Sequence, residues 1–327
     1  MNPRDFVNRL NMLSRGYQQS QILFTALRGG VFRHLETPHT AAEIAAAVGW
    51  DARGARMLLD GLVALELAVS EQGRYRNAPI ASQCLVPGAP ADQTHILEHA
   101  AHAYETWGRF LDAVRTGEAV SRERPDRPPE ELRAFILGMA DLTRHAAPAV
   151  LDAVDLSDRR HLLDLGTGPG AYSIAFLRAH PGLRATLFDF PQVIEIAREQ
   201  VAAAGLIDRV AFVSGDLTRD EFGNDYDVVL LSNIIHSFGP KTNQAIVKKC
   251  HACLRPGGLL IVKDFLVDSG RTGPPFSLIF ALHMLVHTGK GDTYTCEDVA
   301  DWTDAAGFRP GRFVDLGYAS RLWLAEK

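Results

Sequence analysis

The second half of the chain alternates between short apolar runs and longer amphipathic segments. Between the helical segments lie five apolar runs of strand length: 161–166 (HLLDLG), 185–190 (ATLFDF), 210–216 (VAFVSGD), 227–233 (DVVLLSN) and 259–265 (LLIVKDF). Apolar strands that alternate with helices are typical of a parallel sheet covered on both faces. The final residues contain two more strand runs joined by a short turn, which predict an antiparallel hairpin at the sheet edge. The pattern therefore predicts an α/β fold.

The first half has a different pattern, helical and rich in Ala and Leu. Thr40 and Glu43 have the spacing of a capping box at a helix start, and Gly49 ends that helix. Asp51 caps the next helix, and Gly73 marks a turn between two short strand-like runs. Helix, turn, helix and hairpin together predict a winged helix.

A polar, proline-punctuated connector at residues 117–129 separates the halves, and one helix is predicted after it, over residues 130 to 154. We therefore expect a winged-helix domain at 1–115, a connector with a linking helix at 116–155 and an α/β domain at 156–327.

A winged helix raises the hypothesis of a DNA-binding regulator, which the charges disfavour. The would-be recognition helix carries Arg53 and Arg56 against Asp60 and Glu66. The first 100 residues hold nine basic and nine acidic side chains, and the formal net charge of the chain is -5. Duplex DNA is read through a basic face, so we expect no nucleic-acid partner. The domain is expected to bind protein, its own twin included.

The composition excludes further classes of protein. The chain of 327 residues is 46% hydrophobic and 22% charged, as in globular proteins, and no run of about 18 apolar residues predicts a membrane span. The start has no uninterrupted apolar run, so no secretory signal is expected, and four cysteines make no disulfide framework. A cytoplasmic location follows as the expectation. Cys250 and Cys253 form a single C-x-x-C motif, with no second cysteine pair to complete a zinc site. Their segment is predicted to be an amphipathic helix that ends at a Pro-Gly-Gly sequence. We therefore expect the two cysteines to pack in the core and not to bind zinc.

The candidate chemistry begins with a glycine-rich turn, HLLDLGTGPGAYSI, after the first strand run. Gly166, Gly168 and Ala171 fit the G-x-G-x-x-A pattern of a dinucleotide turn. Asp164, Gly166, Gly168 and Gly170 fit D-x-G-x-G-x-G, the turn that holds S-adenosylmethionine. A dinucleotide would bring its pyrophosphate against the Asp164 carboxylate, whereas S-adenosylmethionine brings an ammonium and a sulfonium. The turn therefore favours S-adenosylmethionine over a nicotinamide cofactor.

Two further acids follow at strand ends. Asp189 ends the second strand run, where a carboxylate can accept from both ribose hydroxyls of either cofactor. Asp216 ends the third, where an acid can accept from the adenine amino group. Three acids at three successive strand ends are a stronger signal than one glycine motif.

With these features, the chain resembles the class I S-adenosylmethionine-dependent methyltransferases. It is most similar to the small-molecule O-methyltransferases with an N-terminal winged-helix dimerisation domain, such as plant phenolic and bacterial natural-product enzymes. The resemblance covers nearly the whole chain and rests on six segments in family order: DLGTGPG, FDFPQVI, GDL, SNIIHSF, LRPGGLLIVKDF and GKGDTYTCED with the later AAGF.

The resemblance implies a Rossmann-like methyltransferase fold, with a mostly parallel sheet and a C-terminal antiparallel hairpin, preceded by an all-helical winged-helix dimerisation domain, its wing aside. It implies a homodimer that methylates a hydroxyl of an aromatic or polyketide-like small molecule and releases S-adenosylhomocysteine. The implied cofactor-binding residues are Asp164, Gly166, Thr167, Gly168, Gly170, Asp189, Phe190, Gly215, Asp216, Leu217, Ser232 and Asn233.

The family places its general base in a segment usually written H-D-W, which here is HSF. By resemblance, His236 takes the proton from the attacking hydroxyl, and imidazole is the side chain suited to that task near neutral pH. Plant members hold this histidine with two carboxylates. The first position falls on Asp264, shortened from glutamate, and the second on Thr293, with Asp292 next to it as a possible substitute. A lysine common near the adenine in plant members falls on Ser232.

Histidines elsewhere have helical spacing, but no H-E-x-x-H motif or third ligand accompanies them, so no metal is expected. In this family such segments run past the acceptor, and the expected acceptor-pocket residues are His99, Trp107, Met139, His283, Met284 and His287. Three alternatives stay open: an N- or C-methyltransferase, a non-methylating relative of the same fold, and a winged-helix regulator.

Overall fold

The computed structural model describes residues 1–121, 128–317 and 319–327, which divide into two compact units, 1–104 and 105–327. Residues 122–127, in the middle of the predicted connector, lie outside the described residues.

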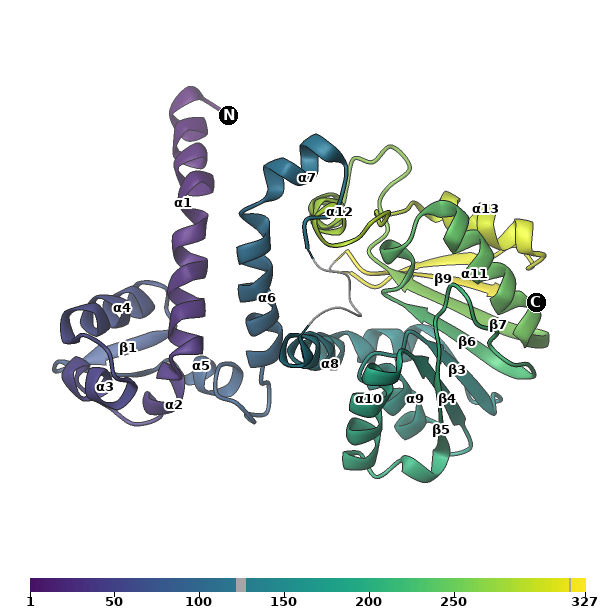
Figure 1. Cartoon of the computed structure of the whole chain (residues 1–327), viewed down its shortest axis with the longest axis horizontal. Coiled ribbons are helices and arrows are strands. Elements are labelled where there is room, and N and C mark those ends of the chain that lie inside the picture. The colour runs from purple at the N-terminus through teal and green to yellow at the C-terminus, as the bar shows by residue number, and fades with distance from the viewer. Residues whose placement is uncertain (122–127, 318) are drawn as a thin grey trace. The chain divides into compact units, whose positions relative to one another are not determined.

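The first unit is helical apart from one hairpin, as the sequence predicts (Figure 1). Thr40 and Glu43 form the expected capping box, Gly49 ends its helix with a left-handed φ of +70°, and Asp51 caps the next helix. The hairpin turns around Gly73. The elements are α1 Pro3–Arg28, α2 Val31–His34, α3 Ala41–Val48, α4 Ala52–Ala64, β1 Ala68–Glu71, β2 Arg74–Asn77 and α5 Pro79–Cys84, and α6, Thr94–Trp107, runs across the boundary between the units.

The second unit is built on one seven-stranded sheet of order β5-β4-β3-β6-β7-β9-β8. The first five strands in that order are parallel, while β9 is antiparallel to both β7 and β8. All five predicted strand runs and the final hairpin are therefore confirmed. The strands are β3 His161–Leu165, β4 Arg184–Asp189, β5 Val210–Ser214, β6 Tyr226–Ser232, β7 Leu254–Asp264, β8 Arg312–Asp315 and β9 Arg321–Glu326.

The helical segments of this unit are α7 Phe110–Thr116, α8 Pro129–Ala153, α9 Ala171–Ala179, α10 Pro191–Ala203, η2 Ile207–Arg209, η3 Ile235–Ser237, α11 Pro240–Cys253, α12 Pro275–His287 and α13 Cys296–Ala306. Of these, α8, α9 and α10 pack on one face of the sheet, and α11 and α13 pack on the other.

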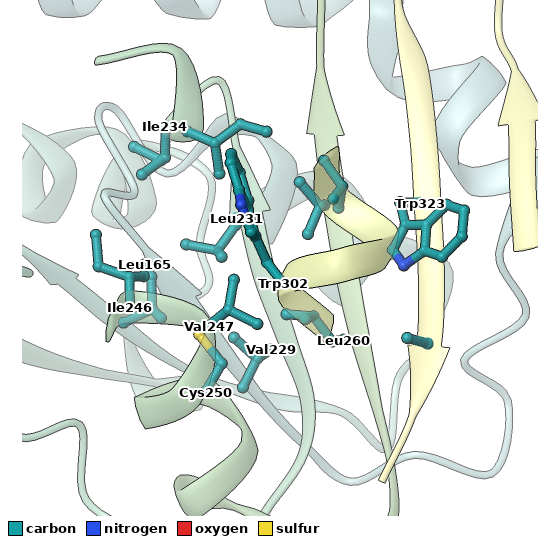
Figure 2. Close-up of a cluster of buried hydrophobic side chains, with 14 of the residues drawn as sticks. Leu165, Val229, Leu231, Ile234, Ile246, Val247, Cys250, Leu260, Trp302 and Trp323 are labelled. Atoms are coloured by element: carbon teal, nitrogen blue, oxygen red, sulfur yellow. The ribbon is translucent and has the colours of Figure 1, made fainter. Parts of the chain in front are cut away.

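Side chains on successive strand residues point to opposite faces, which gives the unit two apolar cores. On β3, Leu162 packs with α8, α9 and α10, whereas Leu163 and Leu165 pack with α11 and α13. Figure 2 shows the second core, where Trp302 of α13 and Cys250 of α11 lie over the central strands. Because both faces are covered, the open part of the sheet is its strand ends.

The chain reverses its direction of travel across the sheet at β3. From β3 it proceeds to β4 and β5 on one side, and then returns to place β6 on the other side. In open α/β sheets, ligands bind outside the carboxyl ends of the strands at such a switch point. This geometry directs attention to the segments that follow β3 and β6.

One helix boundary differs from the prediction. The helix that contains Cys250 and Cys253 ends at Cys253, and the Pro-Gly-Gly sequence belongs to β7, where Gly257 N donates to Lys327 O at 3.0 Å. Pairing with the C-terminal strand region, distant in sequence, thus extends β7 over residues that resemble a helix stop. The two cysteines are buried free thiols that pack in the core, as expected.

Candidate active site

The predicted cofactor turn joins β3 to α9, and its glycines are in the left-handed region, with φ of +67° at Gly166, +56° at Gly168 and +74° at Gly170. A Cβ on Gly166 would clash with the side chain of Ile234, and one on Gly170 would lie 2.9 Å from Leu187 Cδ2. A Cβ on Gly168 would meet no described atom within 4 Å. The backbone at Gly168 is therefore open to close approach by a ligand.

Asp164 lies in β3, one residue before its end, and is buried. Its Oδ2 accepts hydrogen bonds from Thr167 Oγ1 at 2.9 Å and Ser173 Oγ at 2.6 Å. Burial raises the pKa of Asp164 to about 6, and the charge of Asp189 adds to the rise, while the two hydroxyls oppose it. Oδ1 makes no hydrogen bond with any described residue, so it is left for a cation such as an ammonium.

Asp189, at the end of β4, has a structural task that the sequence pattern did not reveal. Its Oδ2 accepts from Gly168 N at 2.9 Å, and its Oδ1 accepts from Phe190 N at 2.8 Å. The carboxylate thus fastens the glycine turn to the neighbouring strand. A carboxylate can accept more than one hydrogen bond at each oxygen, so binding of a ribose hydroxyl by Asp189 stays a prediction.

Asp216 follows β5, where its Oδ1 accepts from Thr218 N at 2.8 Å and Thr218 Oγ1 at 2.7 Å. Gly215 is required just before it, because a Cβ there would clash with the ring of Phe188. The Asp216 carboxylate therefore orders the turn after β5, and its contact with an adenine stays a prediction.

The remaining predicted cofactor residues lie in the same region. Leu217 is buried beside Gly166, Ser232 ends β6, and Asn233 follows it with a left-handed φ of +56°. The fold therefore brings the predicted cofactor-binding set to the carboxyl ends of four adjacent strands, β5, β4, β3 and β6.

His236 and Asp264, the predicted base and its partner, are in direct contact. His236 lies on η3 just after β6, Asp264 ends β7, and Nδ1 of the imidazole is 2.7 Å from Oδ1 of the carboxylate. Both side chains are buried. Burial alone would raise the pKa of Asp264, but the His236 imidazole, the Phe265 backbone N–H and the Lys263 ammonium outweigh it and lower that pKa.

This pair fixes the imidazole tautomer. An ionised carboxylate can only accept, so the Nδ1 proton of His236 lies toward Asp264 and Nε2 carries the free lone pair. A carboxylate behind a histidine also stabilises the imidazolium that forms when the ring takes a proton. The His236–Asp264 pair can therefore act as a general base.

The second carboxylate position of plant relatives is not filled here by an acid that contacts the imidazole. Thr293 is buried, and the Asp292 carboxylate forms an ion pair with Arg271, Oδ1 to Nη2 at 2.8 Å. Asp292 instead supports His236 through the backbone, its N–H donating to His236 O at 3.0 Å. Within the described residues, Asp264 is the one carboxylate paired with the His236 ring.

An aromatic wall extends from His236 along α12. The Phe280 ring lies 5.0 Å from the imidazole, and the Phe265 ring lies 4.8 Å from Phe280. The wall continues through Phe276 and His283 to Trp107, whose Nε1 donates to His283 Nδ1 at 3.2 Å. The sequence analysis identified His283 and Trp107 but missed Phe265, Phe276 and Phe280. For the two phenylalanines of α12, the spacing 276, 280, 283 and 287 marks one helix face.

The other predicted acceptor-pocket residues are placed as follows. His287 is on the same helix face, its ring 4.2 Å from that of His283. Met284 is buried, and Met139 lies partly buried on α8. His99 lies on α6 in the first unit, so its part in an acceptor pocket stays a prediction.

The described residues contain neither a metal-binding cluster nor a membrane-spanning helix. No group of three or more His, Cys, Asp or Glu side chains is arranged to hold a metal ion there. Nor is any helix in that part of the chain both long and apolar enough to cross a membrane.

Comparison with protein families matches both parts of the chain. Residues 112–309 match the model of an O-methyltransferase domain, and residues 12–87 match that of an O-methyltransferase dimerisation domain.

Curated relatives match over almost the whole length. A 3-hydroxy-5-methyl-1-naphthoate 3-O-methyltransferase of Streptomyces sahachiroi is 33% identical, over 94% of this chain and 92% of the relative. Acetylserotonin O-methyltransferase of Bos taurus is 32% identical, over 97% of both chains. Among solved structures, human N-acetylserotonin methyltransferase in complex with S-adenosylmethionine has a TM-score of 0.90 at 28% identity, covering 100% of this chain and 99% of that one.

Proposed function

The chain belongs to the O-methyltransferase family and is an S-adenosylmethionine-dependent O-methyltransferase; from this premise, we propose that it methylates a hydroxyl of an aromatic or polyketide-like small molecule, with His236 as general base. The observation that carries the proposal is the buried His236–Asp264 pair after β6, beside an aromatic wall.

S-adenosylmethionine supplies a methyl group activated by the positive charge of its sulfonium. The donor set of the cofactor turn fits this ligand. Asp164 offers a carboxylate oxygen to its ammonium, Asp189 offers lone pairs to the ribose hydroxyls, and the open backbone at Gly168 permits close approach. A pyrophosphate in this position would face two carboxylates, which opposes a nicotinamide cofactor.

The chain's own contribution to the reaction is to take a proton and to hold the acceptor. A phenol with a pKa of about 10 is mostly protonated at neutral pH, so its attack is faster when a base removes the proton. Nε2 of His236 takes that proton, and the Asp264 carboxylate stabilises the resulting imidazolium. Alignment of the acceptor hydroxyl with the methyl group is a second source of rate, because it removes the entropy cost of bringing the two together.

The aromatic wall supports an aromatic acceptor. Phe265, Phe276 and Phe280 offer flat apolar faces close to His236, and planar rings stack or pack edge-on against such faces. Relatives that act on a naphthoate and on acetylserotonin, both aromatic, agree with this class.

The dimerisation domain supports a homodimer. Four large apolar side chains of α1 are exposed at helical spacing: Phe6, Leu10, Leu13 and Tyr17. An apolar stripe of this kind on one helix face is typical of a protein interface. We infer that the first unit forms the contact between two copies of the chain, while the second unit carries the donor site.

The test is methyl transfer from ¹³C-methyl-labelled S-adenosylmethionine to a panel of phenols and naphthols, with the product identified by NMR. We expect a new O–CH₃ signal, and a loss of about 10²- to 10⁴-fold in kcat for His236→Ala at neutral pH with donor binding unchanged. Transfer to nitrogen or carbon alone would contradict O-methylation. Full activity of the His236→Ala variant would mean that alignment of acceptor and donor accounts for the rate without a general base.

A further inference from the structure

One buried charge beside the catalytic pair has so far been given only an electrostatic effect on Asp264. Lys263 precedes Asp264 in β7 and is 3% exposed. Its Nζ donates to Asn233 Oδ1 at 3.0 Å and lies 4.9 Å from the centre of the Phe265 ring. No carboxylate of a described residue forms an ion pair with it. Burial lowers the pKa of Lys263 to about 8, although the charge of the neighbouring Asp264 opposes the fall.

Lys263 and Asn233 hold each other by two hydrogen bonds across neighbouring strands. Besides the side-chain bond, Asn233 N donates to Lys263 O at 2.8 Å. Asn233 has a left-handed φ of +56°, a conformation that asparagine tolerates better than most residues. It lies directly after β6 and directly before Ile234, whose side chain fills the space beside Gly166. The pair therefore lies at the same strand edge as the cofactor turn.

The ammonium sets the direction of the Asn233 amide. An ammonium only donates hydrogen bonds, so it holds the carbonyl oxygen Oδ1 and turns Nδ2 away. Nδ2 makes no hydrogen bond with any described residue, and the side chain is only partly buried. Two N–H donors are thus left directed at ligand or solvent.

The chemistry of the donor indicates which group these N–H donors meet. At β5, β4 and β3 the strand ends present carboxylates, which suit the amino, hydroxyl and ammonium groups of S-adenosylmethionine. The remaining polar group of the donor is its carboxylate, which these acids repel. On the other side of β3, the Asn233 amide after β6 and the Lys263 ammonium of β7 present N–H donors and a positive charge, while the Asp264 carboxylate that ends β7 is paired with His236.

We propose that Lys263 is a positioning residue that acts through Asn233, turning the Asn233 amide so that its N–H groups bind the methionine carboxylate of the donor. This inference rests on the proposed function, because it requires S-adenosylmethionine at the strand edge. It assigns the two charged groups on the α-carbon of the donor to different residues, the ammonium to Asp164 and the carboxylate to the Lys263–Asn233 pair.

The test compares ligands with and without the carboxylate in titration calorimetry. Lys263→Met keeps the length and apolar stem of the side chain and removes the ammonium. We expect its Kd for S-adenosylmethionine and S-adenosylhomocysteine to rise about tenfold, the effect of one weakened hydrogen bond to a charged group. The Kd for 5′-methylthioadenosine, which lacks the whole amino-acid part with its carboxylate and ammonium, should not change. The melting temperature should not fall, because a buried unpaired charge is removed.

Asn233→Gly supplies the matched variant, since glycine adopts the left-handed φ and lacks the amide. If Lys263 acts through Asn233, the double variant should bind S-adenosylmethionine no more weakly than Asn233→Gly alone. Additive losses, an unchanged Kd in Lys263→Met, or an equal loss for methylthioadenosine would overturn the proposal. Failure of the wild type to bind S-adenosylmethionine would instead contradict the proposed function.

Discussion

At the scale of single residues, Asp264 decides how well His236 can act as a base. Asp264→Asn keeps the shape of the side chain but removes its charge and lets it donate to Nδ1, which favours the wrong imidazole tautomer. We expect kcat to fall by about 10²- to 10⁴-fold, with an unchanged Kd for S-adenosylmethionine. Single-turnover methyl transfer and calorimetry measure the two effects.

The control is Asp264→Glu, which restores the residue of the plant enzymes and keeps the charge. It should lose much less activity than Asp264→Asn. Equal losses in both variants would mean that packing around the pair, and not the charge of Asp264, limits the rate.

The raised pKa of Asp164 predicts that binding of the donor depends on pH. Its pKa in the free protein is raised to about 6, chiefly by burial, so the carboxylate takes up a proton as the pH falls through 6. A protonated acid no longer attracts the donor's ammonium, and we expect the Kd for S-adenosylmethionine to rise below about pH 6. Calorimetry between pH 5 and 8 measures this.

Asp164→Asn is the matched control, because its Oδ1 can still accept from Thr167 and Ser173. It should bind the donor weakly and without this pH dependence. The folded state raises the pKa of Asp164 from 3.8 to about 6, so this group costs the free protein stability as the pH rises between those values, and the loss is complete at pH 7. The variant should therefore melt at a higher temperature at pH 7. A pH-dependent Kd in the variant would assign the effect to another group.

Two glycines of the cofactor turn differ in what an added methyl group meets. Gly166→Ala forces a left-handed alanine and a clash with Ile234, so we expect a loss of about 2–5 kcal/mol in the free energy of unfolding. In Gly168→Ala the added methyl group meets no described atom within 4 Å. We therefore expect the free energy of unfolding to fall only by the cost of a left-handed alanine, about 1–2 kcal/mol. Urea unfolding measures both, and equal losses would contradict the assignment of Ile234 as the steric constraint.

At the scale of elements, the sequence predicts the sheet well because its strands are buried runs that need no partner to be recognised. The three strand-end acids could be placed from the same pattern. The bond of Asp189 to Gly168, the ion pair of Asp292 with Arg271 and the path of β7 through Pro-Gly-Gly could not. Each depends on a partner that is distant in sequence, so no local periodicity reports it.

The phenylalanines of α12 illustrate a signal that was present in the sequence. Phe276, Phe280 and His283 recur at helical spacing, but an apolar helix face is as typical of a core as of a pocket. Exposure separates the two cases, since Phe276 is 52% exposed. That information comes only from the fold.

The position of Phe280 on α12 leads to a prediction about acceptor binding. Phe280→Ala removes the ring that packs edge-on against His236, and we expect the KM for a phenolic acceptor to rise about tenfold or more, with little change in the Kd for S-adenosylmethionine. Ile279→Ala, at an exposed neighbour on α12, should leave both unchanged. Steady-state kinetics with one acceptor tests the pair, and a large loss of donor affinity in Phe280→Ala would show that the ring serves the donor.

At the scale of the whole molecule, the apolar stripe of α1 predicts how two copies associate. A charge placed in an apolar interface loses its hydration without a partner, so Leu10→Glu combined with Leu13→Glu should convert a dimer into monomers. Sedimentation equilibrium at micromolar concentration measures this. Met57→Glu, at an exposed apolar position on α4, is the control and should stay dimeric.

The same variant separates the tasks of the two units. The predicted donor-binding residues all lie between Asp164 and Asp264, within the second unit. The monomer should therefore bind S-adenosylmethionine with the wild-type Kd, which calorimetry measures. A dimer that persists would place the interface elsewhere, and a monomer that fails to bind the donor would show that the donor site itself depends on association.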